Sequence, residues 1–171
     1  MKILKFGGTS VGTVESIEQV ISIIQKNIVA GNKIAVVYSA FGGVTNKLIE
    51  IGKLASTHDM HYLELLKLVE ERHLNAVRGL VDIKAQSSAM AKTKGLFNEL
   101  EDLLRGVSLL QELSLRTMDF LLSFGERLST TIITEALLSR GIAASFLDAR
   151  KIIKTDDHFS HAEVNFSLTN E

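Results

Sequence analysis

Two glycine-rich segments carry the residues of this sequence that could do chemistry. In the first, Lys5-Phe6-Gly7-Gly8-Thr9-Ser10, a short apolar run ends in a glycine pair and two hydroxyl side chains. Glycines let backbone amides approach a ligand closely, and the free amides of a following helix favour an anion. A lysine just before the glycines adds a charge that can reach a phosphate. The same residues would also suit an ordinary strand-to-helix turn, and they match neither a Walker A loop nor a GxGxxG fingerprint.

The second segment, Ser39-Ala40-Phe41-Gly42-Gly43-Val44-Thr45-Asn46, repeats this combination of glycines and hydroxyl side chains. Its residues Ser39 and Thr45 could donate hydrogen bonds to a carboxylate or a phosphate. Further along, Glu126 follows Ser123 by three residues, a spacing that predicts a capping box at a helix N-terminus. The alternative is a functional role, in which Glu126 faces the two glycine-rich segments and binds the ammonium group of a substrate.

The elements around these segments follow from the spacing of apolar residues. Steps of three and four predict an amphipathic helix from Thr13 to Val29, preceded by a short strand and followed by a buried strand at 33–38. A strand, a helix and a strand of this length form a βαβ unit, so the two strands should be parallel. Both glycine-rich segments then lie at the carboxyl ends of parallel strands, where open α/β sheets bind ligands.

Most of the remaining chain is predicted to be helical. We expect a helix at 47–55, and then two leucine-striped helices within about 60–113 that form a helical hairpin. Leucine stripes of this kind are core far more often than a partner-binding surface. Residues 82–94, rich in Ser, Ala, Lys and Thr, are expected to form a mobile connection between these two helices.

The carboxyl-terminal third is predicted to contain two helices and a strand. One helix should run over 114–122 and a second from the Ser123 segment to about Arg140, with a third strand at 142–147. With no interdomain linker, the fold class is a single α/β domain with a mostly parallel sheet flanked by helices, spanning residues 1–171.

Composition narrows the class of protein. The chain is 46% hydrophobic with a formal net charge of −1, which argues against a dedicated nucleic-acid or membrane surface. It has no cysteine, so thiolate metal sites, disulfides and a cysteine nucleophile are excluded. His158 and His161 beside two aspartates could suggest a metal, but without a distant third ligand a solvated loop is favoured, and no metal site is predicted. Lacking a signal-peptide or membrane-spanning pattern, the chain is expected to be cytoplasmic.

The quoted segments resemble those of aspartokinases, in the amino-acid kinase family. The resemblance rests on the Lys5 to Ser10 segment, on Ser39-Ala40 with Thr45-Asn46, on Gly125-Glu126, and on the stretch from Leu147 to Phe159. It implies a carbamate-kinase-like fold and an enzyme that transfers the γ-phosphoryl group of MgATP to the side-chain carboxylate of L-aspartate, the first step towards lysine, threonine and methionine. The long helical stretch is similar to that of aspartokinases with a large helical insertion.

The resemblance also implies roles for individual residues. Lys5 would be catalytic and neutralise the transferring phosphoryl group, while Gly7, Gly8, Thr9 and Ser10 would contact phosphate oxygens. Ser39, Thr45 and Glu126 would bind the aspartate, with the glutamate opposite its α-ammonium group. A homo-oligomer, a dimer, is expected.

The family's kinase domain continues beyond residue 171, with the nucleotide-binding half and the regulatory ACT domains. The sequence is therefore expected to be an amino-terminal lobe that is inactive alone. Two alternatives stay open: a kinase of the same family acting on glutamate, acetylglutamate or a nucleotide, and a non-catalytic binding or dimerisation module.

Overall fold

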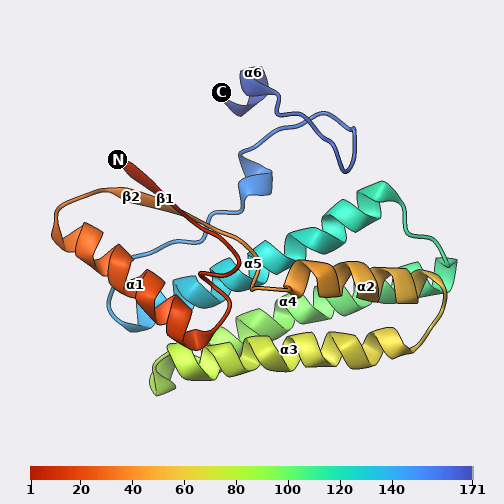
Figure 1. Cartoon of the computed structure of the whole chain (residues 1–171), viewed down its shortest axis with the longest axis horizontal. Helices are drawn as coiled ribbons and strands as arrows, with labels where there is room; N and C mark the ends of the chain where they lie inside the picture. Colours follow the sequence, from red (N-terminus) through yellow and green to blue (C-terminus); the bar gives the residue numbers. More distant parts are fainter. Residues whose placement is uncertain (171) are drawn as a thin grey trace.

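A small parallel sheet and a bundle of long helices make up the computed structural model, which describes residues 1–170 (Figure 1). Strands β1 (Lys2–Phe6) and β2 (Ile34–Tyr38) pair in parallel, with Lys5 opposite Val37. Helix α1 (Val14–Val29) connects them. The predicted βαβ unit is therefore confirmed.

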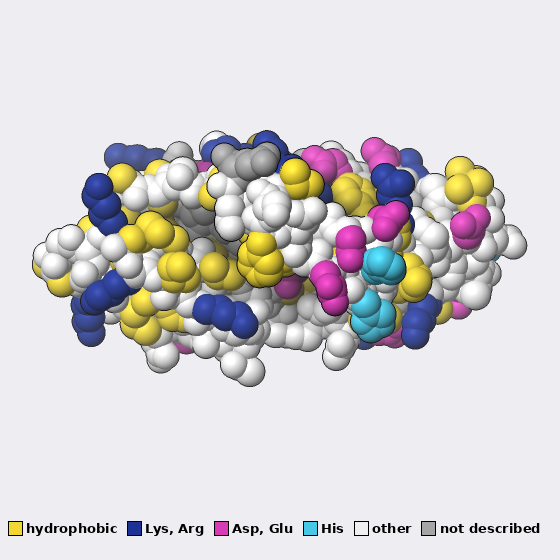
Figure 2. Space-filling model, turned by 90° about the horizontal axis from the view of Figure 1, so that it is seen from above, with side chains coloured by type: hydrophobic (Ala, Val, Ile, Leu, Met, Phe, Trp, Pro, Cys, Tyr) yellow, Lys and Arg dark blue, Asp and Glu magenta, His cyan; other side chains and the backbone are white. Residues whose placement is uncertain are grey.

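The two faces of this sheet differ in exposure. Phe6 and Tyr38 stack on the inward face with ring centroids 6.1 Å apart. On the other face, the side chains of Ile3 and Val37 are 69% and 50% exposed. Figure 2 shows hydrophobic side chains lying between basic ones at the end of the molecule that carries the sheet. The second strand was predicted to be buried, but only one of its faces is covered, since alternate residues of a strand point to opposite sides.

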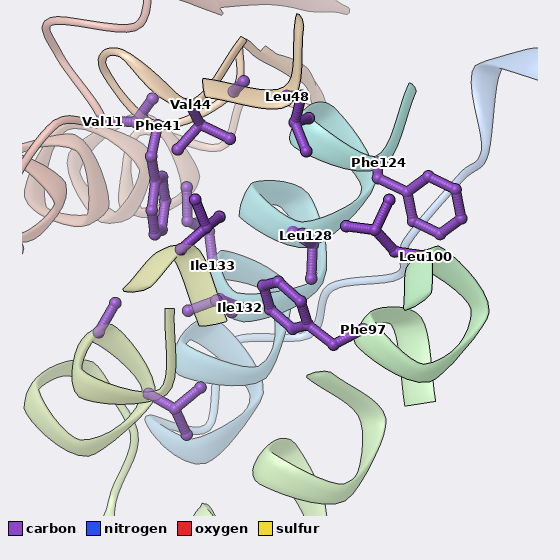
Figure 3. Close-up of a cluster of buried hydrophobic side chains, with 14 of the residues drawn as sticks. Val11, Phe41, Val44, Leu48, Phe97, Leu100, Phe124, Leu128, Ile132 and Ile133 are labelled. Carbon is purple, nitrogen blue, oxygen red and sulfur yellow. The ribbon is translucent and has the colours of Figure 1, made fainter. Parts of the chain in front are cut away.

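Four helices pack against one another to form the bundle: α2 (Val44–Ser56), α3 (His61–Leu80), α4 (Ile83–Leu110) and α5 (Leu115–Ser139). Figure 3 shows their shared core, to which α2, α4 and α5 contribute large apolar side chains, including Leu48, Phe97, Leu100, Phe124, Leu128, Ile132 and Ile133. The prediction that the leucine stripes are core is confirmed. The helical hairpin of α3 and α4 packs on α2 and α5.

The mobile connection predicted at 82–94 was wrong. Helix α3 ends at Leu80, and α4 begins at Ile83 after the short turn at Val81 and Asp82. The early part of α4 buries small side chains, Ala89 and Thr93, each with no exposed surface. The sequence analysis relied on leucine stripes and therefore missed this buried face, which small side chains form. Alanine nevertheless favours a helix, since it has the highest helix propensity of all residues.

Two predictions about the carboxyl-terminal third also fail. Helix α5 runs without a break from Leu115, so Ser123 lies inside it and donates its hydroxyl to the carbonyl of Phe120 at 2.7 Å. Residues 142–147 form no strand; this segment instead lines a cavity of about 750 Å³ beside β2. Ile142 and Ala144 pack against the core, although the segment joins no hydrogen-bonded ladder.

The chain ends in short elements, the 3₁₀ turn η1 (Ala149–Lys151) and helix α6 (Phe166–Thr169). Thr155 and Val164 form an isolated antiparallel bridge between them. Among residues 1–170, no helix is long and apolar enough to cross a membrane.

Candidate functional site

The two glycine-rich loops lie at the carboxyl ends of β1 and β2, as the sequence predicted, and the structure shows that they touch each other. A Cβ atom added to Gly8 would lie 3.3 Å from the carbonyl oxygen of Ala40. A Cβ atom added to Gly42 would lie 3.1 Å from the carbonyl oxygen of Gly8. These distances are shorter than ordinary van der Waals contact, so a side chain at either position would push the two backbones apart by a few tenths of an ångström.

The first loop is closed by a capped helix. Thr13 is the N-cap of α1, and its hydroxyl accepts a hydrogen bond from the amide of Ser16 at 3.2 Å. The hydroxyl of Ser16 in turn accepts from the amide of Thr13 at 3.0 Å. These two hydrogen bonds form a capping box at the start of α1. The amides of Gly8 and Thr9 have no acceptor within residues 1–170 and remain available to a ligand.

The second loop leads into a helix without a side-chain cap. Gly43 is the N-cap of α2, with φ of 83°, and no side chain caps this end of the helix. No described residue accepts a hydrogen bond from the amides of Thr45 and Asn46. Free amides in the first turn of a helix, together with the helix dipole, favour a negatively charged group there.

Glu126 faces the second loop from the middle of α5. Its Oε1 accepts a hydrogen bond from the amide of Ala40 at 3.2 Å, and the residue is otherwise exposed. The preceding residue explains how the helix comes so near, because a Cβ atom on Gly125 would lie only 2.8 Å from the Cβ of Ala40. The capping-box prediction is therefore wrong, since Glu126 lies far from either end of its helix.

A second residue of α5 fixes the start of the same loop. The buried hydroxyl of Ser129 donates to the carbonyl of Ser39 at 2.8 Å, and the amide of Ser39 donates to the carbonyl of Phe6 at 3.1 Å. The backbone of Ser39 is thus tied to both α5 and β1.

The other predicted residues lie around these loops. Lys5 is exposed on the open face of the sheet, and Thr45 is exposed in the first turn of α2. Ser10 closes a turn by donating its amide to the carbonyl of Gly7 at 2.9 Å. In the described part of the chain, no hydrogen bond or ion pair joins Lys5 directly to Thr45 or Glu126. The structure therefore brings the two loops and Glu126 together, with Lys5 at the strand end that enters the first loop.

Two further charged side chains, Arg127 and Asp148, line the same cavity as Glu126. The guanidinium of the next residue, Arg127, lies 4.4 Å from the ring centre of Phe124 and donates to Glu99 at 2.8 Å. Asp148, which lines the same cavity, accepts hydrogen bonds from Arg150, and these bonds hold the pKa of its carboxyl below the usual value.

Two residues of α3 that the sequence analysis did not single out also contact the loops. Arg72 donates to the carbonyls of Gly12 and Gly42, each at 2.8 Å. His73 is fully buried and stacks on Phe41, with ring centroids 4.8 Å apart. Both residues occur in the helical hairpin, far from the loops in sequence, so no local pattern points to them.

Comparison with known proteins agrees with this arrangement. The sequence profile of the amino acid kinase family matches residues 1–170. The chain is 34% identical to the chloroplastic aspartokinases 2 and 1 of Arabidopsis thaliana, over 95% of its own length. It spans only 29% and 28% of the length of these two relatives.

Solved structures show the same fold. The crystal structure of E. coli aspartokinase III in complex with aspartate and ADP is 26% identical, with a TM-score of 0.86 over 99% of this chain and 36% of that one. The complex of the same enzyme with lysine and aspartate is 25% identical, with a TM-score of 0.83 over the same shares of the two chains. From its sequence, its fold and the arrangement of its two loops, the chain belongs to the amino acid kinase family.

Proposed function

We propose that this chain forms the aspartate-binding side and the first phosphate loop of an aspartate kinase site. The observation that carries the proposal is the position of Glu126, whose carboxylate is held against the second glycine-rich loop by the amide of Ala40. A negative charge and the uncapped start of a helix then lie at the same loop. An amino acid, which carries both an ammonium and carboxylate groups, is the complementary ligand.

On the aspartate side, the two kinds of charge on the substrate are separated. The carboxylate of Glu126 would bind the α-ammonium group. The free amides and the hydroxyl of Thr45, at the start of α2, would bind a substrate carboxylate, with Ser39 nearby. This division supports an α-amino acid over a nucleotide as the substrate.

On the phosphate side, the first loop offers donors without a competing partner. The free amides of Gly8 and Thr9 fit phosphate oxygens, and Gly7 and Ser10 shape the turn that presents them. The ammonium of Lys5 would neutralise charge on the transferring group. ATP would be the phosphoryl donor, and Mg²⁺ would arrive with the phosphates, as it commonly does in kinases.

The chemistry asks mainly for positioning and charge neutralisation. A side-chain carboxylate oxygen of aspartate would attack the γ-phosphorus as the bond to ADP breaks, so no covalent enzyme intermediate is required. The residues of this chain would hold the acceptor in line and stabilise the charge that spreads over the phosphoryl oxygens. We further propose that the protein acts as a homo-oligomer.

Titration of the ¹⁵N-labelled 171-residue chain with L-aspartate, followed by amide NMR, tests the proposal. L-Aspartate should shift the amides of Ala40, Thr45 and Asn46 at saturable concentrations. N-Acetyl-L-aspartate lacks the ammonium group and should bind at least about tenfold more weakly, because the charge-assisted hydrogen bond to Glu126 is lost. Glu126→Gln still offers an oxygen to the amide of Ala40, but it should weaken the binding of L-aspartate by a similar factor.

The comparison ligands decide between the alternatives. L-Glutamate and acetylglutamate should shift the same amides only weakly. Tighter binding of either one would reassign the substrate within the family. If no amino acid shifted either loop while the chain self-associated, the non-catalytic module would be supported instead. Glu135→Gln is a matched control, because Glu135 lies on α5 but pairs with Lys92 of α4 at 2.7 Å, and it should leave aspartate binding unchanged.

A further inference from the structure

Arg72 of helix α3 joins the two glycine-rich loops through one guanidinium group. Its Nη1 donates to the carbonyl of Gly42 and its Nη2 to the carbonyl of Gly12, both at 2.8 Å. Gly12 ends the first loop and Gly42 lies in the second, 30 residues further along the chain. A single side chain, from neither loop, therefore connects both.

The bridged carbonyls lie where the two backbones already meet. A Cβ atom added to Gly42 would lie 3.6 Å from the Cα of Gly12 and 3.1 Å from the carbonyl oxygen of Gly8. Contact between two glycine backbones provides little side-chain packing to fix their relative position, and glycine has more backbone freedom than any other residue. The two charge-assisted hydrogen bonds of Arg72 supply a directional restraint at this contact.

Two other residues of α3 contact the second loop and the start of α1. The imidazole of His73 stacks on Phe41 of the second loop at 4.8 Å, with an angle of 9° between the ring planes. At Gly79, a Cβ atom would lie 3.0 Å from a methyl group of Val14, the first residue of α1. Helix α3 therefore packs against the second loop and against the start of α1, which follows the first loop, and this packing positions the side chain of Arg72.

We propose that Arg72 is a positioning residue, which holds the phosphate loop and the aspartate loop in one fixed arrangement so that their ligands are bound in line. The identity of these ligands rests on the function proposed above, whereas the coupling of the loops rests on the geometry alone. The helical hairpin thereby has a role in the site as well as in the core.

Bridging the two carbonyls requires a side chain with two hydrogen-bond donors in a fixed geometry, as the guanidinium group has. Arginine can donate from two nitrogen atoms in a fixed plane, whereas the ammonium of lysine is a single point of charge on a flexible stem. Arg72→Lys keeps the charge but cannot reproduce the bridge, and Arg72→Gln removes the charge as well. Both variants should therefore behave alike if the bridge matters, whereas a purely electrostatic role would be preserved by lysine.

The test measures amide hydrogen exchange in the 171-residue chain by NMR. Arg72→Gln and Arg72→Lys should each accelerate exchange of the hydrogen-bonded loop amides of Ser10, Ser39 and Ala40 by about tenfold, because loss of local hydrogen bonds raises local opening. Amides of the α5 core should exchange as in the wild type. Arg78→Gln is the matched control, because this arginine of the same helix donates only to Asn75 within the described chain, at 2.6 Å, and it should leave both loops unchanged.

Ligand titration completes the test. Tripolyphosphate and L-aspartate, added separately to the Arg72 variants, should each bind about tenfold more weakly, because loosened loops must be ordered on binding. Unchanged exchange in the loops, rescue by lysine, or equal acceleration throughout α5 would overturn the inference. If the wild type bound neither probe but the loop amides still exchanged faster in the Arg72 variants, the positioning role would stand and the proposed function would fail.

Discussion

His73 is the most deeply buried ionisable side chain in contact with the site loops. Its ring is fully buried between Phe41 and Phe97, and its Nδ1 lies 2.7 Å from the carbonyl of Val69. Its Nε2 has no partner within the described residues. Burial lowers the pKa of this imidazole to about 4 from an ordinary value of 6.5, so the folded protein holds it neutral.

This pKa predicts a specific loss of stability in mild acid. The unfolded chain binds a proton to His73 near pH 6.5, whereas the folded chain resists it until about pH 4. Stability is therefore fully present above pH 6.5 and falls as the pH is lowered towards 4. Denaturant unfolding should show about 2 kcal/mol less stability at pH 5 than at pH 7.5 from this residue.

His73→Phe, which keeps an aromatic ring beside Phe41 but cannot be protonated, should lose this part of the pH dependence. His61→Gln, at the exposed start of the same helix, should retain it. If the His73→Phe variant and the wild type showed the same slope between pH 7.5 and 5, the ring would not be neutral in the fold.

At the scale of the elements, the close contact between α5 and the second loop decides where Glu126 lies. Gly125 is buried in the middle of the helix, at a position where glycine costs helix stability relative to alanine. It is required because the side chain of Ala40 comes too near for a Cβ atom at this position. Gly125 thus lowers the stability of α5 but permits the contact with the second loop that places Glu126.

We predict that Gly125→Ala destabilises the fold and displaces Glu126. The new methyl group would lie 2.8 Å from the Cβ of Ala40, and overpacking of this kind costs about 1–3 kcal/mol, partly offset by the helix propensity of alanine. Denaturant unfolding should give a lower free energy of unfolding, and L-aspartate should bind more weakly.

Gly95→Ala, in another helix of the same bundle, is expected to stabilise the protein instead of destabilising it. Gly95 lies in α4 with nothing within 4 Å of an added Cβ atom, so alanine should stabilise the protein by about 0.5–1 kcal/mol. Equal effects of the two substitutions would show that α5 does not approach the loop as closely as described.

At the scale of the whole molecule, the helical bundle is well covered and the sheet is not. The bundle core contains large side chains with no exposed surface, such as Leu100 and Ile132. The outward face of the sheet instead exposes Ile3 and Val37 beside Lys5. Exposed apolar side chains on a two-stranded sheet commonly mark a surface that another chain covers.

We therefore predict that the 171-residue chain self-associates through this face. Sedimentation velocity should show a sedimentation coefficient that rises with concentration over the micromolar range. Val37→Lys should suppress the rise by placing a charge beside Lys5. Leu68→Lys, at a leucine of α3 that is 62% exposed, should leave it unchanged. A wild type that stayed monomeric at all concentrations would contradict the prediction.

Features set by residues close together in the sequence were easier to predict than contacts between distant segments. The βαβ unit, the position of the two loops at one edge of the sheet and the leucine-rich core were all predictable, because they depend on periodicity and on the order of elements along the chain. The continuity of α5 was not predictable, because the spacing of Ser123 and Glu126 locally resembles a helix start. Tertiary packing overrides such local preferences.

By itself, the sequence determined which residue types stand at the ends of the two strands, and thus that the protein has two adjoining loops rich in free amides. Only the tertiary structure decided that Glu126 faces the second loop and that Arg72 ties both loops together. These contacts join residues 86, 30 and 60 positions apart in the chain. Their geometry is fixed by the packing of α3 and α5 against the loops, which no local pattern of residues encodes.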